Sequence, residues 1–462
     1  MIFTQKEFFA LFGIVFVLYW TFRSTRFQNI LLLVASYVFY GWVHPWFVLL
    51  IGTSTIVDYN VGRALHKFAH RRKLILLISL AFNLGLLGYF KYFNFFISSF
   101  DALFLWLGLS LDISTLQIFL PVGVSFYTFQ ALSYTIDIYR GELEPSDNFI
   151  DFALFVSFFP QLVAGPIERA KRFLPQITNS RSWSWDRFTE GWQLVIEGFL
   201  YKVMVADSIA VYVNQIYMLE KPPLFLLAVG TLAFSLQIYA DFQGYTHLAR
   251  GFAKMIGFDL VINFNSPYMA ISPSDFWRRW HISFSSWIRD YLFIPLGGSR
   301  VKYAWMFFLV LSASLGLSGL WHGAAWHFVI WGLYHAVIIF TYHTLGLGGR
   351  WQPEGVVMTW TARLVMFALT NIGWLFFRAP SIRWLANAFE APRLLGSGNA
   401  FATALAILGL IALFSIPMLV MRWLKKIEDN NSTLKAFAYS AAVFFILIYS
   451  GLGSQDFIYF QF

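Results

Sequence analysis

The longest stretch without a charged side chain, the 47 residues from Tyr303 to Gly349, constrains this chain more than any other feature. A bilayer core accepts about 20 consecutive apolar residues as a helix, because a helix satisfies its own backbone hydrogen bonds. The stretch is long enough for two helices, with a break expected near Gly316 to Gly323. Further stretches without Lys, Arg, Asp or Glu are Phe27 to Val57, Leu74 to Phe90, Ile113 to Ile136, Phe152 to Ile167, Pro222 to Ala240, Leu364 to Phe377, Leu394 to Met421 and Ala436 to Gln455. The sequence therefore predicts an all-α polytopic membrane protein.

The number of spans follows from the length of the chain. Only 12% of the 462 residues are charged, against about 25% in soluble domains. At about 20 apolar residues per span plus loops, we expect roughly ten to thirteen transmembrane helices in a single membrane-embedded domain over residues 1–462. The stretch from Phe27 to Val57 should break between Gly41 and Pro45. The weakly apolar segments Trp192 to Ala206 and Gly244 to Phe258 should be buried helices. No small-residue cleavage site follows the apolar residues Phe8 to Phe22, so they are expected to be an uncleaved first span.

The charges that remain are unevenly distributed. The net charge is +9, and the basic residues gather in short clusters between apolar runs, with the densest cluster from Arg63 to Lys73. Such clusters favour cytosolic loops facing anionic lipid, or an anionic cytosolic substrate, over nucleic acid. The chain has no Cys, which excludes thiol nucleophiles and disulfides, and it has no phosphate-binding loop of the P-loop kind.

One segment, Ser272 to Gly298, is predicted to be a helix that does not span the membrane. Ser272, Pro273 and Asp275 form a helix start, and Pro295 with Gly297 and Gly298 ends it. Aromatic residues at steps of three and four form one stripe, and basic and polar residues form the adjacent one: Trp277, Trp280, Phe284, Trp287 and Tyr291, then Arg278, His281, Ser285 and Arg289. Two readings stay open, an interfacial anchor helix and the wall of a cavity lined by protein.

His322 is the strongest candidate for a catalytic residue. It lies in the longest charge-free stretch, between the small residues Gly319 and Gly323, and histidine is the side chain best suited to take a proton near neutral pH. The alternative is a core histidine bonded to a backbone carbonyl. Three more histidines follow in the same stretch, His327, His335 and His343, but no Asp or Glu accompanies them, so we predict no metal site.

Single acidic residues near the ends of apolar runs are more simply explained as members of structural ion pairs than as catalytic residues. We expect most of these acids to pair with a nearby Arg; they are Asp58, Asp137, Asp241 and Asp290. Asn263 and Asn265, in the sequence INFNSPY, are expected to form turns.

Four long motifs and the terminus resemble the membrane-bound O-acyltransferases, in particular a bacterial branch. The longest, DFWRRWHISFSSWIRDYLFIPLGG, covers Asp275 to Gly298, and the others cover Pro121 to Gly141, Phe158 to Gln176, Ser318 to Ala336 and the terminal Phe457 to Phe462. The resemblance extends over nearly the whole chain. It implies a many-helix body, with re-entrant or interfacial helices, around a central tunnel.

The resemblance also implies an activity and its residues. It implies a multi-pass protein of the bacterial cytoplasmic membrane that takes acetyl from acetyl-CoA, with no permanently bound cofactor. The acetyl group would pass, through a periplasmic partner of the SGNH type, to a polysaccharide such as alginate, cellulose or peptidoglycan. His322 and His281 match the catalytic histidines, and the substrate path is assigned to Arg278, Arg279, Trp277, Trp280, Trp321, Asp290 and Asn265. His247 stands where relatives usually carry an acid. A transporter or flippase for a lipid-linked or acyl substrate, and an acyltransferase for protein, lipid or teichoic acid, remain alternatives.

Overall fold

The computed structural model describes residues 1–109, 115–119, 121, 123–163, 165–349, 351–390, 394–425, 432–450 and 457–458. Within these ranges the chain forms helices and no β-strand, as predicted. The chain divides into two compact units, one made of residues 1–192 and 249–261 and the other of residues 193–248 and 262–462. The prediction of a single domain stays a prediction.

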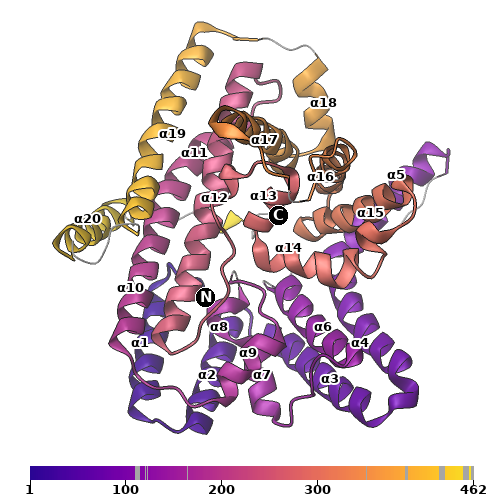
Figure 1. The fold of residues 1–462 in the computed structure, drawn as a ribbon, viewed down its shortest axis with the longest axis vertical. Coiled ribbons are helices and arrows are strands. Elements are labelled where there is room, and N and C mark those ends of the chain that lie inside the picture. Colours follow the sequence, from indigo (N-terminus) through magenta and orange to yellow (C-terminus); the bar gives the residue numbers. More distant parts are fainter. Residues whose placement is uncertain are drawn as a thin grey trace. The chain divides into compact units, whose positions relative to one another are not determined.

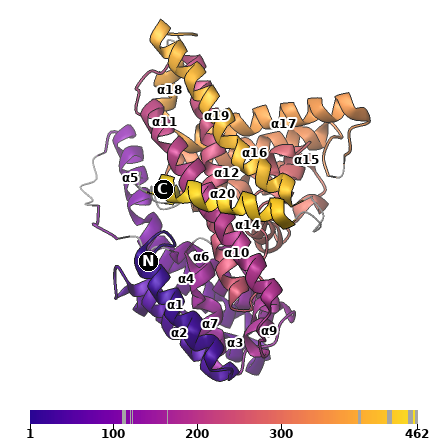
Figure 2. The ribbon, with the colours of Figure 1, turned by 90° about the vertical axis from the view of Figure 1, so that its left-hand side faces the viewer.

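The first unit is a bundle of helices from the amino-terminal part of the chain. Helices α1 and α2 run beside each other, and α3 packs against α4 and α6 (Figures 1 and 2). The break expected between Gly41 and Pro45 is confirmed, because α2 ends at Gly41 and α3 begins at Phe47. The helices are α1 (Lys6–Thr21), α2 (Thr25–Gly41), α3 (Phe47–Lys67), η1 (Ala69–Arg71), α4 (Arg72–Leu87), η2 (Gly88–Tyr92), α5 (Phe93–Trp106), α6 (Val124–Arg140), α7 (Phe149–Ser157), α8 (Phe159–Leu162) and α9 (Ala170–Thr178).

Two helices continue from one unit into the other, and the remaining helices belong to the second unit. The continuous helices are α10 (Trp185–Phe199) and α12 (Leu224–Met255). The buried helix expected from Gly244 is confirmed as far as Met255, as the last part of α12. The second unit also contains η3 (Leu200–Ala206), α11 (Asp207–Tyr217), η4 (Pro267–Met269), α13 (Pro273–Arg279), α14 (Ile282–Ile288), η5 (Arg289–Phe293), η6 (Gly298–Arg300), α15 (Ala304–His322), α16 (Trp326–Thr344), α17 (Gly355–Arg378), α18 (Ile382–Glu390), α19 (Gly398–Leu424) and α20 (Ser432–Ser450).

Among the residues that the structure describes, six helical segments are long and apolar enough to cross a membrane: Ala69–Trp106, α12, α15, α17, α19 and Thr433–Ser450. Their number is smaller than the ten to thirteen spans expected from chain length. The described part also contains a shorter apolar helical segment, Phe149–Leu162. The chain is a multi-pass membrane protein.

The charge-free stretch folds as the predicted pair of helices. Helix α15 ends at His322 and α16 begins at Trp326, so the break falls at the end of the expected interval. The two helices lie side by side (Figure 1) and touch through glycines. A Cβ at Gly319 would overlap the carbonyl oxygen of Phe328, and one at Gly332 would overlap that of Leu315. Small residues therefore let the two backbones approach closely at the end of the pair that carries His322.

The prediction of one continuous helix from Ser272 to Pro295 is wrong. Helix α13 begins as predicted, with the Ser272 side chain accepting the amide of Asp275, but it ends at Arg279. His281 then adopts a left-handed backbone conformation with φ 42° and ψ 55°, and α14 begins after it. The break splits the expected aromatic stripe between two short helices. Local sequence spacing could not show it, because contacts with a distant segment produce it.

The predicted acid–arginine pairs have mixed outcomes. Asp290 pairs with Arg289, with 2.7 Å between Oδ1 and Nε, as expected. Asp58 instead accepts hydrogen bonds from the Ser79 hydroxyl at 2.6 Å and the Asn83 amide at 2.9 and 3.0 Å, and no cation of the described part contacts it. Asp241 pairs with a lysine. Small polar side chains of α4 thus replace the expected arginine at Asp58.

Candidate functional site

His322 lies in an aromatic pocket at the end of α15. Its side chain is buried, and Gly323, which follows it in an extended conformation, ends the helix. Four rings surround the imidazole, with centroid distances of 4.9 to 5.5 Å: Trp321 of α15, Phe284 of α14, Trp331 of α16 and Phe377 of α17. Four different helices therefore fix this side chain in an environment that excludes water.

His281 occupies the break between α13 and α14. Its side chain is fully buried, and the Phe242 ring of α12 meets it edge-on at 4.6 Å. Burial lowers the pKa of His281 to about 3, because a charged imidazole loses its hydration there. At neutral pH this imidazole is uncharged, so one ring nitrogen can accept a hydrogen bond.

The two histidines contact the same pair of aromatic rings. Phe284 and Trp321 stack at 4.2 Å between centroids. The imidazole of His281 lies 5.0 Å from Phe284 and 6.1 Å from Trp321, while that of His322 lies 5.5 and 4.9 Å from the same rings. Residues about 40 positions apart in the sequence thus meet around one stacked pair.

The tryptophans assigned to the substrate path extend this aromatic region. Trp277 packs against Trp331, which itself contacts His322. Trp280 is buried against Trp374 at 4.8 Å. His335, considered above as a metal ligand, lies parallel to the Phe276 ring and contacts Trp277 and Trp331. This histidine is therefore part of an aromatic stack.

The polar residues assigned to the path divide into two groups. Arg278 and Arg279 share the carboxylate of Asp275, at 3.5 and 3.0 Å, and their side chains are 53% and 32% exposed. Asn265 is exposed, and its amide donates to the carbonyl oxygen of Arg279 at 3.0 Å. These three residues lie together at the end of α13. Asp290 is held by Arg289 beyond α14 and is separate from them in the chain.

A buried ionic cluster near His281 was missed by sequence reasoning. Lys202 of η3 lies 2.7 Å from Asp207 and 2.9 Å from Asp241, and all three side chains are buried. The other oxygen of Asp241 accepts the amide of Ile458 at 2.7 Å. Phe457 packs on Tyr245 at 4.3 Å and on Phe242. The cluster therefore holds Phe457 and Ile458 against Phe242, the ring that touches His281. The signal available in the sequence was Lys202, a lysine within the weakly apolar segment Trp192 to Ala206.

His247, the departure from the family pattern, lies beside an acid after all. Its Nδ1 is 3.3 Å from the buried carboxylate of Glu197 on α10. The same carboxylate contacts the Lys425 ammonium at 2.6 Å and accepts the Tyr439 hydroxyl at 3.0 Å. The position is thus a packed polar junction between α10, α12, α19 and α20.

Comparisons with known proteins agree on one family. The membrane-bound O-acyltransferase family matches residues 143–378, which include both histidines. The chain is 39% identical to the probable alginate O-acetylase of Pseudomonas putida, over 85% of this chain and 80% of that protein. It is 33% identical to the peptidoglycan O-acetyltransferase of Helicobacter pylori, over 78% and 72%. It is 28% identical to the teichoic acid D-alanyltransferase of Bacillus subtilis, over 55% and 68%.

Proposed function

The chain belongs to the membrane-bound O-acyltransferase family, and on that premise we propose that it transfers acetyl from cytosolic acetyl-CoA across the membrane for O-acetylation of an extracytoplasmic polysaccharide. The chain is an acyltransferase. The observation that carries the finer proposal is the pair of buried histidines around Phe284 and Trp321, within the region that matches the family.

The proposed chemistry is direct acyl transfer with His322 as general base. A hydroxyl oxygen attacks the thioester carbonyl while the neutral imidazole accepts its proton. A new C–O bond forms, the C–S bond breaks, and the departing CoA thiolate takes up the proton. A positioned base contributes about 10²–10⁴-fold, and holding both reactants in one pocket removes up to about 7–11 kcal/mol of barrier.

His281 and the paired arginines have supporting roles in this proposal. An uncharged His281 offers a second polar atom beside the reacting carbonyl without a buried charge. CoA carries several negative charges, and the guanidinium groups of Arg278 and Arg279 provide bidentate donors for phosphate. Their partial exposure leaves them accessible to such an anion.

The acceptor is proposed from the relatives. Alginate and peptidoglycan are named in two of them, and cellulose is a further acceptor of the same class. We place the protein in the bacterial cytoplasmic membrane, with a periplasmic SGNH-type acetyltransferase as its partner. Analysis of acetyl groups on the surface polysaccharides of a deletion strain identifies the acceptor, and unchanged acetylation of all of them would contradict the proposal.

The test of the chemistry uses purified protein in lipid nanodiscs with radiolabelled acetyl-CoA. His322→Ala should keep the thermal stability of the wild type and lose at least 100-fold in release of CoA. His343→Ala is the matched control, because His343 lies on α16 but is exposed, and it should retain activity. A folded, fully active His322→Ala would refute the proposed role. Label retained only as acetyl-CoA by the wild type would favour transport.

A further inference from the structure

His281 has a backbone conformation that a non-glycine residue adopts rarely. Among the described residues, Ser266 and His281 are the only non-glycine residues with a positive φ. Residues are held in such regions only where the surrounding structure determines the conformation, and they are frequent at functional sites. The structure must therefore contain contacts that hold the chain on either side of His281.

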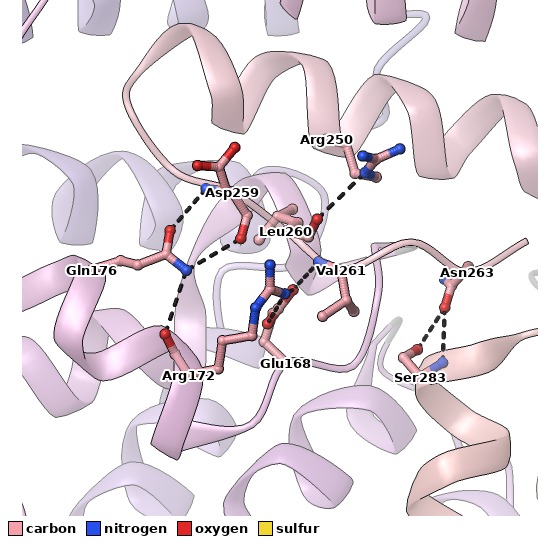
Figure 3. Close-up of polar contacts among 9 residues, drawn as sticks. All are labelled: Glu168, Arg172, Gln176, Arg250, Asp259, Leu260, Val261, Asn263 and Ser283. Carbon is pink, nitrogen blue, oxygen red and sulfur yellow. Dashed lines mark hydrogen bonds and ion pairs between the residues drawn. The ribbon is translucent and has the colours of Figure 1, made fainter. Parts of the chain in front are cut away.

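Those contacts come from Asn263, a fully buried residue of the extended segment after α12 (Figure 3). Its main-chain oxygen accepts the amide of Ile282 at 2.9 Å. Its side-chain oxygen accepts the amide of Ser283 at 3.3 Å and the Ser283 hydroxyl at 2.6 Å. Asn263 thus satisfies the first two amides of α14, which have no partner within their own helix. Its side-chain amide faces the Thr246 hydroxyl at 3.4 Å.

The residues before His281 are tied to the same segment. The amide of Asn265 donates to the carbonyl oxygen of Arg279 at 3.0 Å. Asn265 therefore contacts the chain just before Trp280, and Asn263 contacts it just after His281. Contacts with Asn263 and Asn265 thus hold the chain on both sides of His281. On the Asn263 side the side chain of Asn263 is the acceptor, and on the Asn265 side the Arg279 guanidinium donates to the Asn265 carbonyl oxygen at 3.3 Å.

We propose that Asn263 is the positioning residue of His281. By binding the start of α14, its side chain fixes the left-handed turn and directs the imidazole toward Phe284 and Trp321, the rings shared with His322. Asn263 does not touch substrate in this proposal. The inference rests on the proposed function for its effect on turnover, but the contact itself can be tested separately.

The activity test is a double-mutant cycle in nanodiscs with acetyl-CoA. Asn263→Ala should lower kcat about 10- to 100-fold with KM for acetyl-CoA within about twofold. Because Asn263 acts through His281, adding Asn263→Ala to His281→Ala should lower kcat by less than twofold. Asn263→Asp keeps the acceptor oxygen and should restore most of the activity. The matched control is Asn371→Ala, since Asn371 also accepts a serine hydroxyl at 2.6 Å, from Ser235.

Three results would overturn the inference. The first is a fully active Asn263→Ala, and the second is a fully active His281→Ala. The third is a double variant in which the two decreases in kcat multiply, as a purely structural role of Asn263 would give. If Asn263→Ala does not fold, Ser283→Ala replaces it in the cycle, since it removes the 2.6 Å bond and leaves the amide contact. Ser283→Ala is then expected to lower kcat by a smaller factor, and adding it to His281→Ala should again lower kcat by less than twofold.

A second measurement does not depend on acetyl transfer. Amide hydrogen exchange at Ser283, whose acceptor is the Asn263 side chain, should be at least tenfold faster in Asn263→Ala than in the wild type, and unchanged in Asn371→Ala. Unchanged exchange in Asn263→Ala would overturn the inference whatever the protein does with acetyl-CoA. A wild type that releases no CoA would refute the proposed function instead, so the two failures are distinguishable.

Discussion

Replacing Glu168 with glutamine should remove a large part of the pH dependence of stability. Glu168 is fully buried, and its carboxylate accepts the amide of Val261 at 2.5 Å and contacts Arg172 at 3.3 Å (Figure 3). Burial outweighs both contacts and raises the pKa of Glu168 from 4.5 to about 7. The folded protein therefore holds this proton more tightly than the unfolded chain.

The sign and size of the effect follow from that pKa. The stabilisation is complete below pH 4.5, where both states are protonated, and it is lost as the pH rises through 7. The difference between the two pKa values corresponds to roughly 3 kcal/mol in total, most of which is lost between pH 5 and pH 8. Glutamine keeps an oxygen for the Val261 amide but cannot ionise, so the Glu168→Gln variant should lack this loss.

The assay is denaturant unfolding in mixed micelles at several pH values between 5 and 8. Glu142→Gln, which replaces an exposed glutamate of the same unit, should follow the wild type. If Glu168→Gln shows the same decrease in unfolding free energy with pH as the wild type, burial of Glu168 does not control the pH dependence.

Three further perturbations test other parts of the structure. Lys202→Met leaves Asp207 and Asp241 buried without their cation and should cost about 3–5 kcal/mol of unfolding free energy, measured by the same titration; a cost below 1 kcal/mol would contradict the buried pairing. Gly319→Leu should separate α15 from α16 and lower both the melting temperature and CoA release, whereas a variant as stable as the wild type would refute the close packing. Arg278→Ala combined with Arg279→Ala should raise KM for acetyl-CoA about tenfold at low salt and less at 0.5 M salt, and an unchanged KM would exclude them as CoA contacts.

Several features of the fold could be predicted from local sequence because their causes are local. The absence of charge from Tyr303 to Gly349 predicts two apolar helices, and the small residues at its centre predict where they separate. Gly41 to Pro45 predicts the end of α2 for the same reason. His322 could be singled out as an ionisable group inside an apolar stretch. Its chemical role remains a prediction that the mutant assay tests.

Other features depend on which segments meet in space. Helical periodicity predicted a continuous helix through His281, but the hydrogen bonds of Asn263 with Ile282 and Ser283 compete with it. The partner of Asp241 could not be read from spacing either, because Lys202 comes from a different helix. Sequence alone thus determined the membrane class, the helical architecture and the histidines worth testing, since burial cost and helix period act along the chain. Only the tertiary structure decided where His281 breaks the helix and which rings it shares with His322, because hydrogen bonds and packing between distant segments outweigh local helix preference.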